Sequence, residues 1–408
     1  MRIVVQKFGG TSLSTAEGRS EAIRHIRHAL NESYRPVVVV SAMGRKGEPY
    51  ATDTLLDWIE RNGNSLPDRE KDMLLSCGEL ISAATLCSQL VKSGITATVF
   101  TGRQAGIVTN GKFGNARIVA IHPQPILNKL EKGTVVIVAG FQGGTADGEL
   151  TTLGRGGSDT TATALGSALR ADYVDIFTDV TGVYTADPRI VAQAKQLRSI
   201  SYVEVCQMAL NGAKVIHPRA VEIAMASKTP LRIRSTFTDD EGTWIGEPAG
   251  DHSTGTVRDT EVAGIANTEG IAQLSVTTTE HRLDLQLEVF KAMSEHGISI
   301  DFINVNPSSV VYTVEDQHAE LAVSVLQQLG LSPAYVADCA KIAVIGGGMN
   351  GVPGVMAKIV STLTGLDISI LQSSDSHSAI WVLVHGQFAH KAVQALHSAF
   401  GLDGEPVD

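Results

Sequence analysis

Short apolar runs alternate with longer stretches of mixed polarity over roughly the first 245 residues. Mostly unbroken apolar runs are typical of strands that are covered on both faces of a sheet. They are expected at Ile3–Val5, Val37–Ser41, Val135–Ala139, Val174–Thr178 and Leu231–Arg234. Helical stretches are expected between them, at Gly18–Leu30, Asp68–Ser93 and Tyr202–Leu210. This alternation predicts an α/β domain with a mainly parallel sheet.

A different pattern follows, in which two segments resemble each other at an offset of about 70 residues. Ile298-Ser-Ile-Asp matches Ile368-Ser-Ile-Leu, and Val310-Val-Tyr-Thr-Val matches Ile380-Trp-Val-Leu-Val. Each segment reads as strand, helix, strand, strand and helix, with a closing strand that the pattern does not place. A small α+β module duplicated in tandem is therefore predicted.

A polar stretch rich in Gly, Thr and Asp, Asp239–Thr260, separates the two patterns and is typical of a linker. The predicted boundaries are residues 1–245 for the first domain, 246–260 for the linker, 261–338 for the first module and 339–408 for the second.

Composition narrows the class of protein. The 408 residues carry 33 basic and 43 acidic side chains, a net charge of −10, so no basic excess exists to neutralise nucleic-acid phosphates. The four cysteines show no C-x-x-C pair or metal-ligand spacing, which favours reduced thiols. The N-terminus leads directly into a predicted strand, and no apolar run approaches the ~20 residues of a membrane span. We expect a cytoplasmic protein with neither nucleic-acid nor membrane partners.

The first candidate for chemistry is Lys7-Phe8-Gly9-Gly10-Thr11-Ser12, between the first predicted strand and a helix. Adjacent glycines let the backbone approach a phosphate closely, and N–H groups at a helix start favour an anion. The lysine adds a mobile positive charge for a β- or γ-phosphate. A simple glycine-rich turn accounts for the motif equally well.

The second candidate is Thr151-Thr-Leu-Gly-Arg-Gly-Gly-Ser-Asp159, which precedes a helix of small residues at Thr160–Leu169. Three glycines around Arg155 favour an exposed guanidinium that can bind a carboxylate through two hydrogen bonds. Ser158 or Asp159 can also cap the helix, which is a purely structural role.

The third candidate is Thr178-Asp-Val-Thr-Gly-Val-Tyr-Thr-Ala-Asp-Pro-Arg189, at the carboxyl end of a buried strand. Open α/β sheets bind ligands at that end of their strands. Tyr184 could lie against a purine and Arg189 could reach a phosphate. The alternative is an ordinary loop with a core tyrosine.

Three weaker signals remain. Glu79 lies in an apolar helical stretch, where it is either a solvated side chain or the partner of a substrate ammonium. Lys214 is a second candidate for a phosphate, or a solvated surface lysine. His217 precedes a proline and lacks ligand partners, which favours packing over metal binding. No metal site held by the protein is predicted.

Taken together and in their order along the chain, seven short motifs resemble those of the aspartate kinases. The repeat resembles the paired ACT domains of that family. The motifs are K-F-G-G-T-S, S-A-M-G, G-E-L-I-S, G-F-Q-G, T-T-L-G-R-G-G-S-D-T, T-D-V-T-G-V-Y-T-A-D-P-R and G-A-K-V-I-H-P. The resemblance implies the amino-acid-kinase fold, a mainly parallel sheet between helical layers, followed by two tandem α+β ACT domains.

The resemblance also implies site residues. Arg155 would bind the α-carboxylate of aspartate, Glu79 its α-ammonium, and Asp159 would orient the catalytic lysine. The residues expected to act in catalysis are Lys7, Asp159 and Lys214. Those expected around ATP are Lys7, Phe8, Gly9, Gly10, Thr178, Asp179, Tyr184, Arg189 and Lys214. Those expected around aspartate are Thr52, Glu79, Phe141, Arg155 and Ser158.

The implied reaction moves the γ-phosphoryl group of ATP to the β-carboxylate of L-aspartate, giving 4-phospho-L-aspartate. It is the first step of lysine and diaminopimelate, threonine and methionine biosynthesis. A carboxylate has a reference pKa near ~4, so the nucleophile is already ionised and needs no general base. Lysines, glycine N–H groups and Mg²⁺ carried by the nucleotide phosphates would neutralise the meeting anions.

Feedback control through the ACT domains is implied as well. Many such modules carry Pro-Gly before their first helix; the second module keeps it at Pro353-Gly354, whereas the first lacks it after Thr277. Gln372–His377 with Trp381 resembles the diaminopimelate-sensitive branch more than the lysine- or threonine-sensitive ones. ACT modules pair across subunits, so a homodimer or larger oligomer is expected.

Two alternatives remain at this point. One is a related kinase for glutamate or N-acetylglutamate, which the Thr151–Thr160 motif and the repeat disfavour. The other is an amino-acid sensor without catalysis, which the presence of Lys7 with Lys214, and of Arg155 with Glu79, disfavours.

Overall fold

The computed structural model describes residues 1–61, 63, 66–213, 215–246, 261–278, 284–349 and 352–403. These residues form two compact units. Residues 184–195 and 210–213 group with the C-terminal part of the chain in the second unit, although the sequence places them within the first predicted domain. The described remainder of the first 246 residues forms the first unit.

The first unit contains the predicted sheet, with strand order β10-β12-β11-β9-β1-β2-β6-β3. Neighbouring strands are parallel except for β11 and β12. The strands are β1 (Ile3–Phe8), β2 (Arg35–Val40), β3 (Ala97–Phe100), β6 (Val135–Ala139), β9 (Tyr173–Thr178), β10 (Ser199–Ile200), β11 (Leu231–Ser235) and β12 (Thr243–Ile245). The five predicted strands are confirmed. The linker prediction for Asp239–Thr260 is wrong at β12, whose backbone pairs with both β11 and β10.

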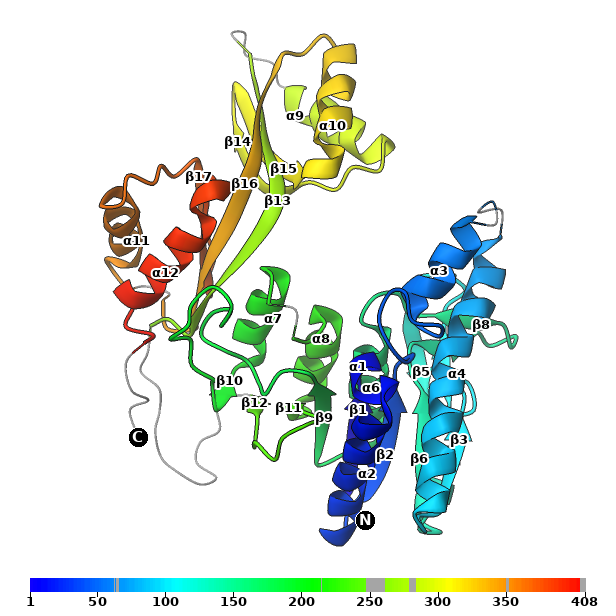
Figure 1. Cartoon of the computed structure of the whole chain (residues 1–408). Helices are drawn as coiled ribbons and strands as arrows, with labels where there is room; N and C mark the ends of the chain where they lie inside the picture. The colour runs from blue at the N-terminus through cyan, green and yellow to red at the C-terminus, as the bar shows by residue number, and fades with distance from the viewer. Residues whose placement is uncertain are drawn as a thin grey trace. The chain divides into compact units, whose positions relative to one another are not determined.

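Helices cover both faces of this sheet (Figure 1). The helices of this unit are α1 (Gly10–Ser14), α2 (Ala16–Asn31), α3 (Thr52–Arg61), α4 (Asp68–Lys92), α5 (Gln124–Leu130), α6 (Gly157–Leu169), α7 (Tyr202–Leu210) and α8 (Pro218–Ser227), of which α3 packs against α4. Alternate strand residues point to opposite faces. Phe8, Val38 and Phe177 therefore pack with α2 and α4, whereas α6 and α8 lie on the other face, where Gly166 approaches Val174.

Helix α4 is, by length and composition, the one helix among the described residues that could cross a membrane. Its apolar positions Ala83, Leu86 and Leu90 lie instead in the core cluster beneath the sheet. It also carries two buried carboxylates, Asp72 and Glu79. The core helix of a globular domain has this composition, because one of its faces is buried.

A second, four-stranded sheet of order β5-β4-β7-β8 lies in the same unit. Its strands are β4 (Ile107–Thr109), β5 (Ile118–Ile121), β7 (Gln142–Gly144) and β8 (Leu150–Thr152). Strand β7 follows β6 after Gly140 and Phe141, and α6 follows β8 after Leu153–Gly156. These connections place the second predicted motif at the carboxyl end of β6.

The second unit confirms the duplicated α+β module. Its six strands have the order β14-β15-β13-β16-β18-β17 and are antiparallel throughout. The elements are β13 (Gly264–Thr277), α9 (Leu285–Glu295), β14 (Asp301–Asn306), β15 (Ser309–Glu315), α10 (Asp316–Gln328), β16 (Pro333–Ile345), α11 (Val355–Thr364), β17 (Gln372–Asp375), β18 (Ala379–His385) and α12 (Ala389–Ala399). Figure 1 shows β13 and β16 as long strands that connect the two pairs of helices.

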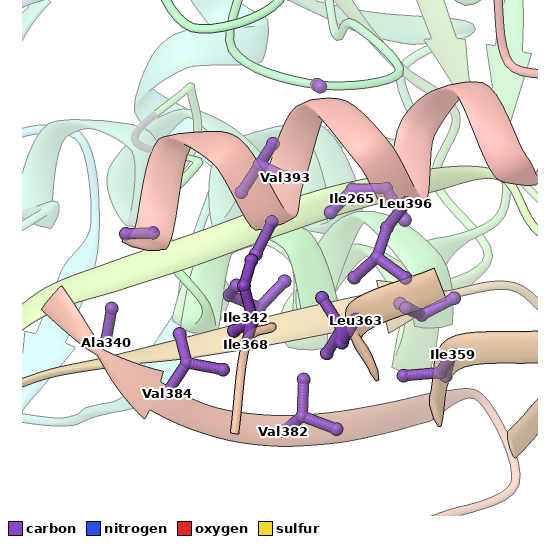
Figure 2. Packing of buried hydrophobic residues seen from close by; sticks show 14 of the residues in the cluster. Ile265, Ala340, Ile342, Ile359, Leu363, Ile368, Val382, Val384, Val393 and Leu396 are labelled. Carbon is purple, nitrogen blue, oxygen red and sulfur yellow. The ribbon is translucent and has the colours of Figure 1, made fainter. Parts of the chain in front are cut away.

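The closing strand of the second module comes from before the first module. Residues 264–268 of β13 pair with residues 341–345 of β16, and the register shifts beyond Thr268. Ile265 packs with Ile342, Val393 and Leu396 in the core of the second module (Figure 2). The later part of β13, including Leu274, packs in the core of the first module. The periodic pattern could not place this strand because it precedes its module in the chain.

Candidate active site

Lys7 and Asp159 meet at the carboxyl end of the main sheet. The lysine Nζ lies 2.7 Å from Asp159 Oδ1, and the side chains are 12% and 13% exposed. Lys7 comes from β1, and Asp159 from the first turn of α6. Asp159 Oδ2 also accepts the backbone N–H of His217 at 3.4 Å. An ammonium has three donors, so Lys7 can keep this partner and still donate to a phosphate oxygen.

Glycine occupies the two positions after β1 for different structural reasons. A side chain at Gly10 would lie 2.5 Å from the carbonyl oxygen of Ala42, so packing against the β2–α3 loop excludes it. At Gly9 the nearest atoms would be 3.6 Å (Phe177 O) and 3.7 Å (Lys7 Nζ) away, which are ordinary contacts. The fold therefore tolerates a side chain at Gly9, beside the lysine. Packing therefore does not require glycine at this position, and a glycine there allows a ligand to approach the backbone closely.

Glu79 is a buried carboxylate in the middle of α4, with 2% of its surface exposed. This burial rules out the solvated alternative. Its Oε1 accepts the backbone N–H of Ala42 at 3.1 Å, whereas Oε2 finds no partner among the described residues. Burial raises the pKa of Glu79 to about 8, against the lowering effect of its backbone hydrogen bonds. A cationic group beside Oε2 would stabilise the ionised form.

Ser158 and Phe141 lie at the junction of β6, β7 and α6. A side chain at Gly140 would lie 2.8 Å from Ser158 Oγ, and one at Gly157 would lie 2.7 Å from Phe141 Cδ2. Phe141 adopts φ +68°, which is unusual for a bulky residue. Its N–H donates to Thr161 Oγ1 at 3.1 Å, and its carbonyl accepts from the N–H of Leu153 at 2.8 Å. These bonds hold the strained backbone in place.

Arg155 is exposed on the glycine-rich connection between β8 and α6, and among the described residues no carboxylate pairs with it. Gly154 and Gly156 flank it at φ +76° and +67°, which disfavour residues with a Cβ atom. Gly156 is also the N-cap of α6, which begins at Gly157 without a side-chain cap. The prediction that Ser158 or Asp159 caps this helix is therefore wrong; both lie in its first turn.

Thr52 is the first residue of α3. The loop before it reaches α4, because a side chain at Gly78 would lie 2.8 Å from both the carbonyl oxygen of Tyr50 and Ala42 Cβ. The residues around Thr52 thus contact the helix next to Glu79.

The structure divides the third motif between the two units. Thr178 and Asp179 belong to the first unit, where Asp179 pairs with Arg45 at 2.7 Å. Tyr184 and Arg189 belong to the second unit. There Arg189 is exposed and pairs with Asp187 through its Nε and Nη2.

Of the weaker signals, Lys214 lies outside the described residues. His217 is the N-cap of α8, where its Nδ1 accepts the N–H of Arg219 at 3.3 Å. Its ring lies where a side chain at Gly156 would be, 2.1 Å from the Cβ position. In the part of the chain that the structure describes, no group of three His, Cys, Asp or Glu side chains could hold a metal ion.

Residues that the motifs did not single out complete the site. The N–H of Ala42 comes from the S-A-M-G motif after β2, to which the sequence assigns no residue roles, and the guanidinium of Arg45 comes from the residue that follows this motif. Asp72 and Arg219 bind the backbone of the Arg155 connection. Asp72 directly follows the charged run Asp68–Lys71 at the start of α4, so the sequence alone does not distinguish it from a solvated carboxylate.

A lysine beside a glycine pair suits a phosphate, and a buried carboxylate with a free oxygen suits an ammonium. At the carboxyl end of this sheet they define a kinase of small amino acids. Residues 2–235 match the amino acid kinase family, and residues 335–398 match an ACT domain.

Within that class, the chain belongs to the aspartokinases. It is 49% identical to aspartokinase 1 of Bacillus subtilis over 402 residues, covering 98% of this chain and 100% of the relative. It is 41% identical to the aspartokinase of Geobacillus stearothermophilus, covering 99% and 98%. Its fold matches Escherichia coli aspartokinase III in complex with aspartate and ADP, with a TM-score of 0.77, 28% identity and coverage of 98% and 99%.

The chain therefore transfers the γ-phosphoryl group of ATP to the β-carboxylate of L-aspartate, and it carries an ACT regulatory domain. The glutamate-type kinase and the sensor without catalysis are set aside by these relatives.

Proposed function

We propose that the first unit holds L-aspartate between Glu79 and Arg155, with its β-carboxylate directed toward Lys7. The observation that carries this assignment is the buried Glu79 carboxylate, one oxygen of which has no partner among the described residues. The substrate ammonium pairs with Glu79, and the α-carboxylate pairs with the exposed Arg155 guanidinium. Thr52, Phe141 and Ser158 line the same site. Aspartate is also bound in the Escherichia coli aspartokinase III structure, which supports this choice.

Lys7, Gly9 and Gly10 bind the ATP phosphates, and Phe8 belongs to the same turn. Asp159 holds the Lys7 ammonium at 2.7 Å and so fixes the direction of its remaining donors. Lys214 of the motif G-A-K-V-I-H-P, which lies outside the described residues, helps to bind the phosphates. These groups act as electrostatic stabilisers of the transferring phosphoryl group, since the β-carboxylate needs no base.

Thr178, Asp179, Tyr184 and Arg189 bind the nucleotide. Mg²⁺ enters with ATP and is held through the nucleotide phosphates. When bound, the ion neutralises charge on the β- and γ-phosphates.

The regulatory proposal concerns the second unit. The effector is an amino acid bound at the ACT domains, and the Gln372–His377 segment favours diaminopimelate over lysine or threonine. Escherichia coli aspartokinase III has been solved with lysine and aspartate, which supports an amino-acid effector. Measuring inhibition by meso-diaminopimelate, lysine and threonine tests this choice, and inhibition by lysine alone would remove it.

The assembly is a homodimer or larger oligomer formed through the ACT domains, in the cytoplasm. The domain boundaries at 1–245, 246–260, 261–338 and 339–408 belong to the same proposal.

Replacing Lys7 with Ala tests the catalytic assignment. We expect kcat to fall by at least ~100-fold, the typical effect of removing one donor to a transition-state anion. Coupled ATP consumption with aspartate, and with glutamate as competitor, measures it. Lys291→Ala, which removes a surface lysine paired with Glu295 on α9, is the matched control and should leave kcat unchanged. Normal turnover by Lys7→Ala would show that the transfer uses other groups.

A further inference from the structure

Asp72 is a fully buried carboxylate that the reaction itself does not use. It lies on α4, seven residues before Glu79. Two helical turns separate the two residues, about 10.5 Å along one face of the helix. Among the described residues no cation pairs with Asp72, and its two oxygens are satisfied by hydrogen bonds.

Those hydrogen bonds come from two backbone segments. Thr152, the last residue of β8, donates its N–H to Oδ2 at 2.7 Å and its hydroxyl to Oδ1 at 2.6 Å. Gly114 donates its N–H to both oxygens at 3.0 Å. Hydrogen bonds to a buried carboxylate are strong, and losing one leaves a donor without a partner.

Leu153, which follows Thr152 in the chain, is held by a side chain from another helix, α8. Arg219 of α8 donates to the carbonyl of Leu153 and to that of Ala116, both at 2.8 Å. The N–H of Ala116 in turn donates to the carbonyl of Thr152 at 2.8 Å. Two charged side chains thus fix consecutive residues of the segment that enters the Gly154–Gly156 turn.

We propose that Asp72 is a positioning residue that sets the distance between the two ends of the amino-acid site. It ties the base of the Arg155 turn to α4, the helix that carries Glu79. One rigid helix then determines the separation of the groups for the substrate ammonium and α-carboxylate. This inference rests on the proposed roles of Arg155 and Glu79.

Asp72→Asn is the direct test, because asparagine keeps the size but replaces one acceptor oxygen by a donor. We expect KM for aspartate to rise at least 10-fold, with KM for ATP changed less than 2-fold. Asp68→Asn, one turn earlier on α4 and exposed, is the matched control and should behave as the parent enzyme. Thr152→Val removes the hydroxyl bond and keeps the backbone bond, so a smaller rise in the same constant is expected. If Asp72→Asn does not fold, Thr152→Val tests the proposal by itself.

Arg155→Ala, measured alone and combined with Asp72→Asn, separates this inference from the proposed function. If Arg155→Ala leaves KM for aspartate unchanged, the role of Arg155 is wrong and the inference falls with it. If Arg155→Ala raises that KM while neither Asp72→Asn nor Thr152→Val does, Asp72 is purely structural and the inference alone is overturned. The inference would also be overturned if Asp72→Asn raised KM for aspartate by the same factor in the parent enzyme and in the Arg155→Ala variant. The inference is supported if Asp72→Asn raises KM for aspartate much less in the Arg155→Ala variant than in the parent enzyme.

Discussion

At the scale of single residues, the site contains a carboxylate whose surroundings oppose its ionised form. Glu79 accepts hydrogen bonds from backbone N–H groups and has no cation beside it among the described residues, and burial raises its pKa to about 8. Such a side chain costs stability and is retained when a ligand compensates it. The proposed ligand group is the α-ammonium of aspartate.

Glu79→Gln should therefore stabilise the protein at alkaline pH. An acid whose folded-state pKa is raised binds more protons in the folded state, so the free energy of unfolding falls as pH rises from about 4.5 to about 8. Glutamine lacks this titration, and the variant should gain several kcal/mol relative to the parent at pH 9, with little gain at pH 4.5. Urea unfolding at the two pH values measures the difference.

The same substitution should weaken aspartate binding. We expect KM for aspartate to rise at least ~10-fold, because a charge-assisted contact is lost. In the parent enzyme this KM should fall as pH rises toward 8, since binding needs ionised Glu79, and the variant should lack this dependence. A variant that gained stability and kept the parent's KM profile would separate Glu79 from the substrate.

At the scale of elements, the local patterns predicted five strands of the main sheet, but not its short strands β3, β10 and β12 or the four strands of the second sheet. Val135–Ala139 and Tyr202–Leu210 have the same limits in the structure as in the prediction. β12 was missed because its three residues lie in a polar, glycine-containing stretch, and pairing with β11 and β10 decides its conformation. The start of α6 was misjudged because Gly156, in a left-handed conformation, takes the N-cap position.

Strand β13 serves two cores, and this division is testable. Ile265 and Leu274 are both buried, the first in the core of the second module and the second in that of the first module. Each substitution by Ala should lower the free energy of unfolding by about 2–5 kcal/mol. Hydrogen exchange should quicken in α11 and α12 for Ile265→Ala, and in α9 and α10 for Leu274→Ala. Equal loosening of both modules by either variant would contradict the division.

At the scale of the whole molecule, part of the motif proposed to bind the nucleotide folds with the ACT modules. Thr185 Oγ1 hydrogen bonds to His397 Nε2 of α12 at 2.9 Å, and both side chains are buried. The carbonyl of Thr185 accepts the N–H of Ile265, and Gln394 donates to the carbonyl of Ile190. Ala186 and Val191 belong to the core of the second module. Residues 184–195 therefore depend on the C-terminal part of the chain for their conformation.

A fragment of residues 1–246 should fold and yet bind ATP poorly. Its main core lies beneath the parallel sheet and does not involve the second unit. Residues 184–195, which include Tyr184 and Arg189 of the proposed nucleotide site, lose the packing that orders them, so ATP affinity should fall at least ~10-fold. Circular dichroism checks the fold and calorimetry the affinity. Full affinity in the folded fragment would show that Tyr184 and Arg189 do not need the second unit.

The amino-acid sequence alone determined the α/β class, the duplicated module and the motifs around Lys7, Glu79 and Arg155. It did so because strand and helix periodicity and glycine-rich turns are local properties of the chain. Only the tertiary structure decided that Lys7 pairs with Asp159, that Glu79 is buried with a free oxygen, and that residues 264–268 close the second module. These features join residues far apart in the chain, and burial and pairing between such residues arise only when the elements pack.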